Sequence, residues 1–401
     1  MARLLGIRIR NYRALADVGV GQVRYAAGQP LPPFACFIGP NGSGKSTLLD
    51  AFGFVADCLL EGVEAACDKP HRGGFQRLHT QGTDGPVEFE IFFEDDDPLR
   101  PIVYTVRIDI ERGMPIVTRE WLRQRQKGQT LGKPYYFLKL ERGRGKVWAG
   151  ELVSGGGARD ERVKLADQTK LGITTLGNLE QHPRIVRLRE YIEGWYLSYF
   201  VPDAARRLPP SGAQRWLDRE GSNVGNVLQY FQRQYAGQFK SILERLKEAI
   251  PGLRQIRPET SKDGRLLLRF DEQGYHDPFY QHSMSDGTLK MLAYAVLLAD
   301  PEPRPFIGIE EPENGLYVQL VEQLARQLDR HASARTQILV TTHSPYFVDA
   351  LQPQQVWVME KGDDGHVRVP RASDFKGVND LVTEGLPLGS LWYSDHLRGE
   401  R

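Results

Sequence analysis

Cysteine is scarce in this chain of 401 residues. The three cysteines are Cys36, Cys58 and Cys67, an odd number with no Cys-x-x-Cys pair. This pattern argues against a disulfide framework and against a structural zinc site. We therefore expect all three to be small, buried, reduced side chains.

Long apolar runs and an excess of charge are also missing. No stretch approaches the ~20 apolar residues that span a bilayer, and the N-terminus lacks the apolar core of a signal peptide. Lys plus Arg number 52 and Asp plus Glu 51, so the overall charge indicates no particular partner. No internal repeat or long heptad run is present. These features predict a cytoplasmic protein without a membrane partner.

Two kinds of periodicity predict an α/β fold. Apolar runs without polar alternation predict buried strands at residues 34–38, 305–310, 337–342 and 355–359. Further strands are predicted at residues 3–10, 87–93, 102–110 and 265–270, the first three from alternating patterns. Helices are predicted at residues 47–60, 183–195, 223–250, 286–299 and 316–331.

A glycine-rich loop lies between the strand at 34–38 and the helix that follows. It consists of Gly39, Pro40, Asn41, Gly42, Ser43, Gly44, Lys45, Ser46 and Thr47. The G-x-x-x-x-G-K-S spacing in a strand–loop–helix context indicates a phosphate-binding loop. Its backbone N–H groups and the helix N-terminus face phosphate oxygens. Lys45 is expected to contact the β- and γ-phosphates of ATP, and Ser46 to be a ligand of Mg²⁺.

Acidic residues end the predicted strand at 305–310. We expect Glu310 to hold Mg²⁺ and Glu311 to orient and deprotonate the attacking water. The alternative is a solvated acidic cluster at a strand end. Glu313 is interpreted as a structural or surface residue.

Two further motifs are candidates for contact with the phosphates of ATP. His343 comes directly after a buried strand and is expected to sense the γ-phosphate, although a histidine there could also be a core or cap residue. Ser285 and Gly287 begin a helix, which makes a second anion-binding terminus. Because one nucleotide does not need two such termini, we expect a head-to-tail dimer in which Ser285 closes on the ATP of the other copy. A simple N-cap by Ser285 is the alternative.

The middle of the chain is locally basic. Residues 111–170 contain 14 Lys or Arg against 7 Asp or Glu, a net charge of +7. We interpret residues 1–110 and 251–401 as two parts of one ATPase domain, and residues 111–250 as an inserted basic and helical subdomain. DNA is a possible partner of the basic segment, and an ordinary solvated surface is the alternative.

The order of these motifs resembles the ABC-type ATPases. The motifs are the phosphate loop, Ser-Asp-Gly-Thr at 285–288, Ile-Glu-Glu-Pro-Glu-Asn-Gly-Leu at 309–316 and Thr-Thr-His-Ser-Pro at 341–345. They are similar to those of the RecF/SMC branch and of stand-alone predicted AAA ATPases related to the OLD family. Residues 9–15 and Gly221-Ser222-Asn223 also look like the latter group. We expect the protein to lack the nuclease domain that OLD nucleases add.

This resemblance implies a P-loop NTPase fold of ABC type, with a mixed central sheet, flanking helices and an inserted α+β subdomain. It also implies two subunits around two ATP molecules, Glu311 as catalytic base, His343 as switch histidine and Arg13 near the nucleotide. Asp286 stands where the transporter-type signature has glycine, and Glu310 where Asp is usual, so turnover is expected to be slow. The metal-contacting glutamine of the family has two candidates, Gln76 and Gln181.

The function expected from the resemblance is a homodimeric or higher-order ATPase that controls a separate effector, such as a nuclease or toxin, in DNA-linked antiviral defence. A RecF-like DNA repair ATPase is the first alternative. The second is a non-catalytic scaffold that binds ATP and sequesters a partner.

Overall fold

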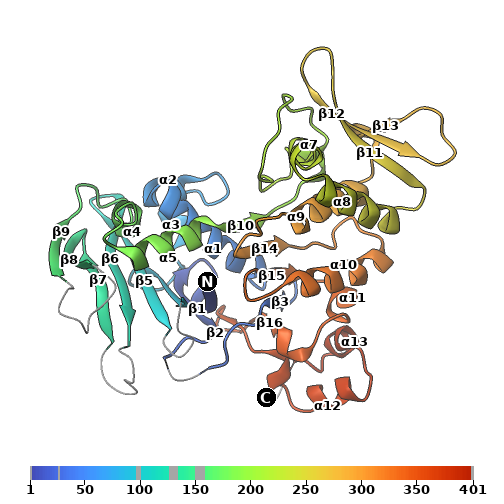
Figure 1. The fold of residues 1–401 in the computed structure, drawn as a ribbon. Coiled ribbons are helices and arrows are strands. Elements are labelled where there is room, and N and C mark those ends of the chain that lie inside the picture. Colours follow the sequence, from blue (N-terminus) through green and yellow to red (C-terminus); the bar gives the residue numbers. More distant parts are fainter. Residues whose placement is uncertain (1, 26–27, 96–100, 126–133, 150–158, 399–401) are drawn as a thin grey trace.

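The computed structural model describes residues 2–25, 28–95, 101–125, 134–149 and 159–398 (Figure 1). It contains a large antiparallel sheet, a parallel sheet and a separate lobe of helices with a small sheet. Cys36, Cys58 and Cys67 are buried and unpaired, as expected. Across the described part of the chain, no helix combines the length and the apolar character needed to cross a bilayer.

The antiparallel sheet has the strand order β2-β1-β4-β5-β6-β7-β8-β9. Its strands are β1 (Arg3–Tyr12), β2 (Leu15–Gly21), β4 (Val87–Glu94), β5 (Ile102–Glu111), β6 (Met114–Gln124), β7 (Tyr135–Glu141), β8 (Arg144–Ala149) and β9 (Arg159–Lys164). The helices packed with it are α1 (Lys45–Leu60), α2 (Val63–Asp68), α3 (Phe75–Leu78), α4 (Gly172–Leu176) and α5 (Pro183–Glu193). The strands predicted near residues 3, 87 and 102 are confirmed.

The domain boundary expected after residue 110 falls inside this sheet. β5 and β6 pair along their whole length, with Glu111 opposite Met114 at the hairpin end. β7, β8 and β9 continue the same sheet by antiparallel pairing. The strands β6, β7, β8 and β9 therefore continue, across the expected boundary, the sheet begun by the N-terminal strands. The sequence Ser-Gly-Gly-Gly at 154–157 is typical of an exposed loop, but these residues lie outside the described part of the chain.

The parallel sheet has the order β10-β14-β15-β3-β16. Its strands are β3 (Phe34–Ile38), β10 (Trp195–Ser198), β14 (Phe306–Glu310), β15 (Gln337–Thr342) and β16 (Val356–Val358). Ala35 and Phe37 belong to the core cluster around α1, whereas Phe34, Cys36 and Ile38 belong to the cluster on the opposite face. Because both faces are covered, the strand needs apolar side chains at every position, which explains the unbroken run in the sequence.

The second face of the parallel sheet packs against C-terminal helices (Figure 1). These helices are α10 (Val318–His331), α11 (Pro345–Val348), α12 (Val378–Thr383) and α13 (Leu388–Tyr393). Short elements among them are η2 (Pro353–Gln355), η3 (Ala372–Asp374), β17 (Glu360–Lys361) and β18 (Val367–Arg368). The helix predicted at residues 316–331 is confirmed as α10.

The separate lobe has its own hydrophobic cluster. Its elements are α6 (Pro202–Ala205), α7 (Val224–Gln234), α8 (Ala236–Ala249), β11 (Leu253–Thr260), β12 (Leu266–Glu272), β13 (Phe279–Tyr280), η1 (Gln281–Ser283) and α9 (Asp286–Leu298). The single helix predicted over residues 223–250 is two helices, because the backbone of Tyr235 leaves helical geometry at φ −137° and ψ 64°.

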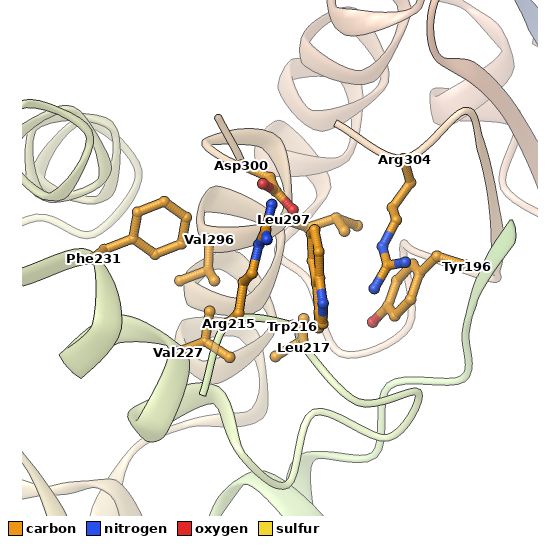
Figure 2. A pocket seen from close by; sticks show the side chains of 10 residues that line it. All are labelled: Tyr196, Arg215, Trp216, Leu217, Val227, Phe231, Val296, Leu297, Asp300 and Arg304. Carbon is orange, nitrogen blue, oxygen red and sulfur yellow. The ribbon is translucent and has the colours of Figure 1, made fainter. Parts of the chain in front are cut away.

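Trp216 lies where the lobe joins the parallel sheet. The guanidinium carbon of Arg215 lies 4.2 Å from the centre of its ring, and that of Arg304 lies 4.0 Å from it, so the indole is held between two cations. Figure 2 shows this arrangement beside Asp300, which follows α9, and Tyr196 of β10. The cluster connects one end of α9 with the central sheet.

Candidate nucleotide-binding site

The phosphate loop joins β3 to α1, as the sequence predicts. Gly39, Gly42 and Gly44 have φ angles of 156°, 79° and 98°, and side chains rarely adopt such values. A Cβ on Gly39 would lie 2.4 Å from the carbonyl oxygen of Met359 and 2.7 Å from Oγ of Ser43. The loop therefore needs glycine for its conformation and, at Gly39, for space as well.

Lys45 points into its own loop. Its Nζ donates hydrogen bonds to the carbonyl oxygens of Gly39 at 2.8 Å and Pro40 at 3.2 Å. Burial lowers the pKa of Lys45, and the nearby carboxylates of Glu310 and Glu311 oppose that shift. The ammonium thus lies in the concave side of the loop, where a bound phosphate would accept its hydrogen bonds.

The remaining loop residues also fit a phosphate and its cation. Oγ of Ser43 is buried and has no hydrogen-bond partner, so it has an unused donor inside the loop. Ser46, in the first turn of α1, is exposed and free to reach a metal ion. Asn41 and Gly42 form the exposed outer part of the loop, and a Cβ on Gly42 would meet open space. The chemistry of these residues suits ATP with Mg²⁺.

The acids lie at the carboxyl end of β14. β14 is a direct neighbour of β15, with Glu310 opposite Thr341, and β15 is a direct neighbour of β3. Because carboxyl ends of parallel strands meet at one edge, Glu310 shares an edge with the phosphate loop. Glu310 is half-buried. This edge is where the sequence predicted the metal-binding acid.

Glu311 begins a tight turn after β14. Its φ angle is 41°, an uncommon value for a side chain other than Asn or Asp. Its N–H donates to the carbonyl oxygen of Thr341 at 2.9 Å. Its carboxylate accepts a hydrogen bond from Nδ2 of Asn314 at 2.8 Å and lies 3.3 Å from Nδ1 of His343. The carboxylate is thereby held from two sides.

Glu313 is buried and fixes the segment that carries His343. Its Oε1 accepts hydrogen bonds from Oγ1 of Thr342 at 2.6 Å and from the N–H of His343 at 3.0 Å. This agrees with the structural role expected for Glu313. His343 itself is exposed, so its ring faces the open side of the site. The structure thus brings the loop, the acids and the histidine to one edge of the parallel sheet.

Ser285 and Gly287 lie in the lobe, at the start of α9. Oγ of Ser285 accepts a hydrogen bond from the N–H of Thr288 at 3.1 Å, so the N-cap expected as the alternative role is present. Ser285 is also exposed, which leaves it accessible to another molecule. Asp286, beside it, forms an ion pair with Arg206.

Arg13 lies at the hairpin between β1 and β2. Its guanidinium is 3.2 Å from Oδ2 of Asp50, in the second turn of α1, and donates to the carbonyl oxygen of His71 at 2.6 Å. Of the two glutamine candidates, Gln181 lies beside Glu161 of the outermost strand β9. Gln76 is an exposed residue of α3.

Two features of the site escaped the sequence analysis. β10 ends beside β14, with Ser198 opposite Ile309, so its carboxyl end approaches Glu310. Lys290 of α9 is buried and donates to backbone oxygens of Glu311 and Asn314. A lysine inside an otherwise apolar helical run is the signal from which the second feature could have been predicted.

Comparisons with known proteins agree with this fold. Residues 34–349 match the family model described as "AAA domain, putative AbiEii toxin, Type IV TA system". No curated protein sequence matches the chain. An SMC head bound to the C-winged helix domain of ScpA is 14% identical, with a TM-score of 0.57 over 92% of this chain and 97% of that chain.

A second similar structure is the SMC head with an extended coiled coil, bound to the C-terminal domain of ScpA, from Pyrococcus furiosus. It is 13% identical, with a TM-score of 0.55 over 96% of this chain and 100% of that chain. The expected fold class, the α/β fold of an ABC-type P-loop NTPase, is confirmed, because the chain shares the fold of these SMC heads and matches an AAA domain model. Because the family model spans more than half of its residues, the chain belongs to the AAA domain family of putative AbiEii toxins of type IV TA systems.

Proposed function

We propose that this chain is an ATPase that dimerises around ATP and thereby controls a separate effector protein. The observation that carries the proposal is the meeting of the phosphate loop, Glu310, Glu311 and His343 at one edge of the parallel sheet. Each of these groups has the chemistry that one step of phosphoryl transfer to water requires.

The roles of the side chains follow from their positions. Lys45 turns from its carbonyl partners to the β- and γ-phosphates. Ser46 and Glu310 hold Mg²⁺, which neutralises charge on the phosphate oxygens. Glu311 accepts a proton from the attacking water, and His343 reports on the γ-phosphate from the open side of the site. The extra methylene of Glu310, compared with Asp, is consistent with slow turnover.

The dimer supplies what a single chain lacks. Ser285 and Gly287 begin an exposed helix N-terminus in the lobe, and such a terminus favours an anion. In a head-to-tail pair, each of these termini closes on the γ-phosphate held by the other copy. The two copies then separate after hydrolysis and phosphate release, because the γ-phosphate that joined them has left the site.

The effector is proposed from the family. Its description names a putative toxin of a type IV TA system, which supports a role in antiviral defence. The SMC heads of similar fold are bound to domains of ScpA, so this fold accommodates a partner protein in those structures. We propose a nuclease or toxin on a separate chain as the partner here.

The outer face of the antiparallel sheet supports DNA as the sensed molecule. Trp121, Lys139, Lys146 and Arg162 lie opposite one another on neighbouring strands. Lys139 and Arg162 are exposed. The guanidinium of Arg119 lies 4.0 Å from the centre of the Trp121 ring. Cations in a row across a twisted sheet suit the phosphate backbone of a duplex.

Steady-state ATP hydrolysis, with and without duplex DNA, tests this proposal. Wild type should hydrolyse ATP, and Glu311→Gln should reduce the rate by about 10²- to 10⁴-fold, the usual contribution of a general base. Lys45→Ala should lose nucleotide binding as well. Absence of hydrolysis by wild type under both conditions would favour the ATP-binding scaffold. Stimulation only by DNA that contains gaps or duplex ends would favour a RecF-like repair ATPase.

A further inference from the structure

Lys290 is a buried charge in an apolar helix. It lies in the second turn of α9, in which every residue from Thr288 to Leu298 is buried. Only 4% of Lys290 is exposed. A lysine is almost never this buried unless its ammonium has partners, because the loss of hydration is costly. The partners of Lys290 therefore indicate why a charge is present in this helix.

Both hydrogen-bond acceptors of Lys290 belong to the turn after β14. Its Nζ donates to the carbonyl oxygen of Asn314 at 2.8 Å and to that of Glu311 at 3.2 Å. Burial lowers the pKa of Lys290 to about 8, although the nearby carboxylates of Glu313 and Glu311 act in the opposite direction. One ammonium thus ties together both ends of a four-residue turn.

A second contact joins the same two segments. A Cβ on Gly287 would lie 2.9 Å from the carbonyl oxygen of Gly315, so the start of α9 lies directly against the turn. Gly315 itself has a φ of 78°, and its own Cβ would lie 3.3 Å from Cβ of Asp286. The helix that begins at Ser285 is therefore packed on the turn at its N-terminus and hydrogen-bonded to it one turn later.

The turn sets the position of the proposed catalytic base. Glu311 has a positive φ, a conformation that persists only where neighbouring groups hold it. Asn314 donates its backbone N–H to the carbonyl oxygen of Glu311 at 3.2 Å and its Nδ2 to the carboxylate at 2.8 Å. A change in the position of Lys290 would move the peptide groups that hold this carboxylate.

We propose that Lys290 is a positioning residue that links α9 to the turn bearing Glu311, so that each site in the dimer responds to ATP in the other. This inference rests on the proposed ATP-bound dimer. When the start of α9 contacts ATP on the second copy, the displacement passes through Lys290 to the base of its own chain. Hydrolysis at the two sites is then coupled, as allostery requires of a shared two-state element.

Three variants test the link. Lys290→Met keeps the apolar stem and removes the ammonium, Lys290→Arg keeps the charge, and Lys240→Met removes an exposed lysine of the same lobe as a control. The assays are kcat, KM for ATP and the Hill coefficient of hydrolysis. Lys290→Met should lower kcat by roughly 10- to 100-fold, because a base misplaced by about 1 Å loses rate on that scale. Its KM should change little, and Lys290→Arg should recover part of kcat.

Cooperativity gives a second readout, and its first test needs the wild-type protein alone. Wild type should show a Hill coefficient above 1, and Lys290→Met should move it toward about 1. A wild-type Hill coefficient of 1, or a Lys290→Met protein with normal kcat and cooperativity, overturns the inference. If Glu311→Gln does not dimerise with ATP, the proposed function itself fails. If it dimerises while Lys290→Met hydrolyses ATP like wild type, only the coupling role is lost.

Discussion

Nδ1 of His343 lies 3.3 Å from Oε1 of Glu311 and 3.4 Å from Oε1 of Glu313. One imidazole thus lies between the proposed catalytic base and the buried acid that fixes its own backbone. The ring is exposed, so it is accessible to a bound nucleotide. In the proposed ATP complex, the histidine would connect the γ-phosphate with the base.

Replacing the histidine should therefore slow the chemical step more than binding. We expect His343→Ala to lower kcat by about 10²- to 10³-fold, the range for loss of one group that stabilises transition-state charge. ATP affinity should change little, because the loop supplies most of the phosphate contacts. His366→Ala, at an exposed turn, is the matched control. Equal losses in affinity and kcat would argue against a sensor role.

A buried ionic network supports α1 behind the phosphate loop. The guanidinium of Arg72 donates to Oδ1 of Asp50 at 2.8 Å and to Oδ2 of Asp57 at 2.8 Å. Burial opposes ionisation of both carboxyl groups, but the hydrogen bonds and charge of Arg72 help to lower the pKa of Asp50. The pKa of Asp57 is lowered by a hydrogen bond from Lys69 and by the charges of Arg219 and Arg72. Both acids therefore remain ionised while buried in the fold.

Removal of Arg72 should leave Asp50 without its main partner and Asp57 without one of its three cationic partners, the others being Lys69 and Arg219. We expect Arg72→Met to lower the free energy of unfolding by about 3–5 kcal/mol. Urea denaturation followed by circular dichroism measures this loss. Arg77→Met, at an exposed position of the neighbouring α3, should be nearly neutral. Similar stability of both variants would contradict the structural role of the network.

Sequence patterns predicted the parts of the site that are local in the chain. The run at 34–38, and the run at 305–310 up to its last residue Glu310, are apolar because their strands are covered on both faces. The residues directly after them, the phosphate loop and Glu311, were assigned to one ATP site. These predictions depended only on residues that are neighbours in the sequence.

Features that depend on distant partners were not predicted. The acceptors of Lys290 are backbone carbonyl oxygens. Every residue has such an oxygen, so the sequence does not show which ones Lys290 contacts. β10 has only four residues, and the helical pattern before it continued to residue 195. The hairpins after residue 110 read as a separate unit, because alternation shows that a strand is half-buried but does not identify its neighbour.

The junction in Figure 2 predicts a pH dependence of stability. Burial raises the pKa of Asp300 to about 6, although Arg304 and Arg215 act in the opposite direction. A carboxyl group with a raised pKa stabilises the fold below its ordinary pKa, about 3.9, and this contribution is lost as the pH rises through about 6. Ionised Asp300 is thus a cost at neutral pH.

Asp300→Asn should remove that cost. Its side-chain oxygen can still accept the N–H of Glu302, which now donates to Oδ1 of Asp300 at 2.9 Å. We expect a gain of about 1 kcal/mol at pH 7.5, after allowance for solvent screening of this partly exposed group. The gain should shrink toward pH 5. Urea denaturation at both pH values measures the difference in stability between the variant and wild type. A variant less stable than wild type at pH 7.5 would contradict the destabilising role of ionised Asp300.

The exposed cations on the outer face of the antiparallel sheet predict salt-sensitive DNA binding. Lys139→Gln and Arg162→Gln should each weaken duplex binding and reduce the slope of log affinity against log salt by about 0.9. Fluorescence anisotropy over a salt series measures both quantities. Lys240→Gln, in the lobe, serves as the control. Unchanged salt-dependence slopes in both sheet variants would show that this face does not contact DNA.

The central claim is that ATP brings two copies together through the exposed start of α9. The most direct measurement is the solution mass of wild type and Glu311→Gln, each with and without ATP and Mg²⁺. We predict a monomer without nucleotide and a stable dimer of Glu311→Gln with ATP, because the unhydrolysed nucleotide holds the two copies together. Ser285→Arg combined with Glu311→Gln should stay monomeric. A monomer of Glu311→Gln under every condition would contradict the account.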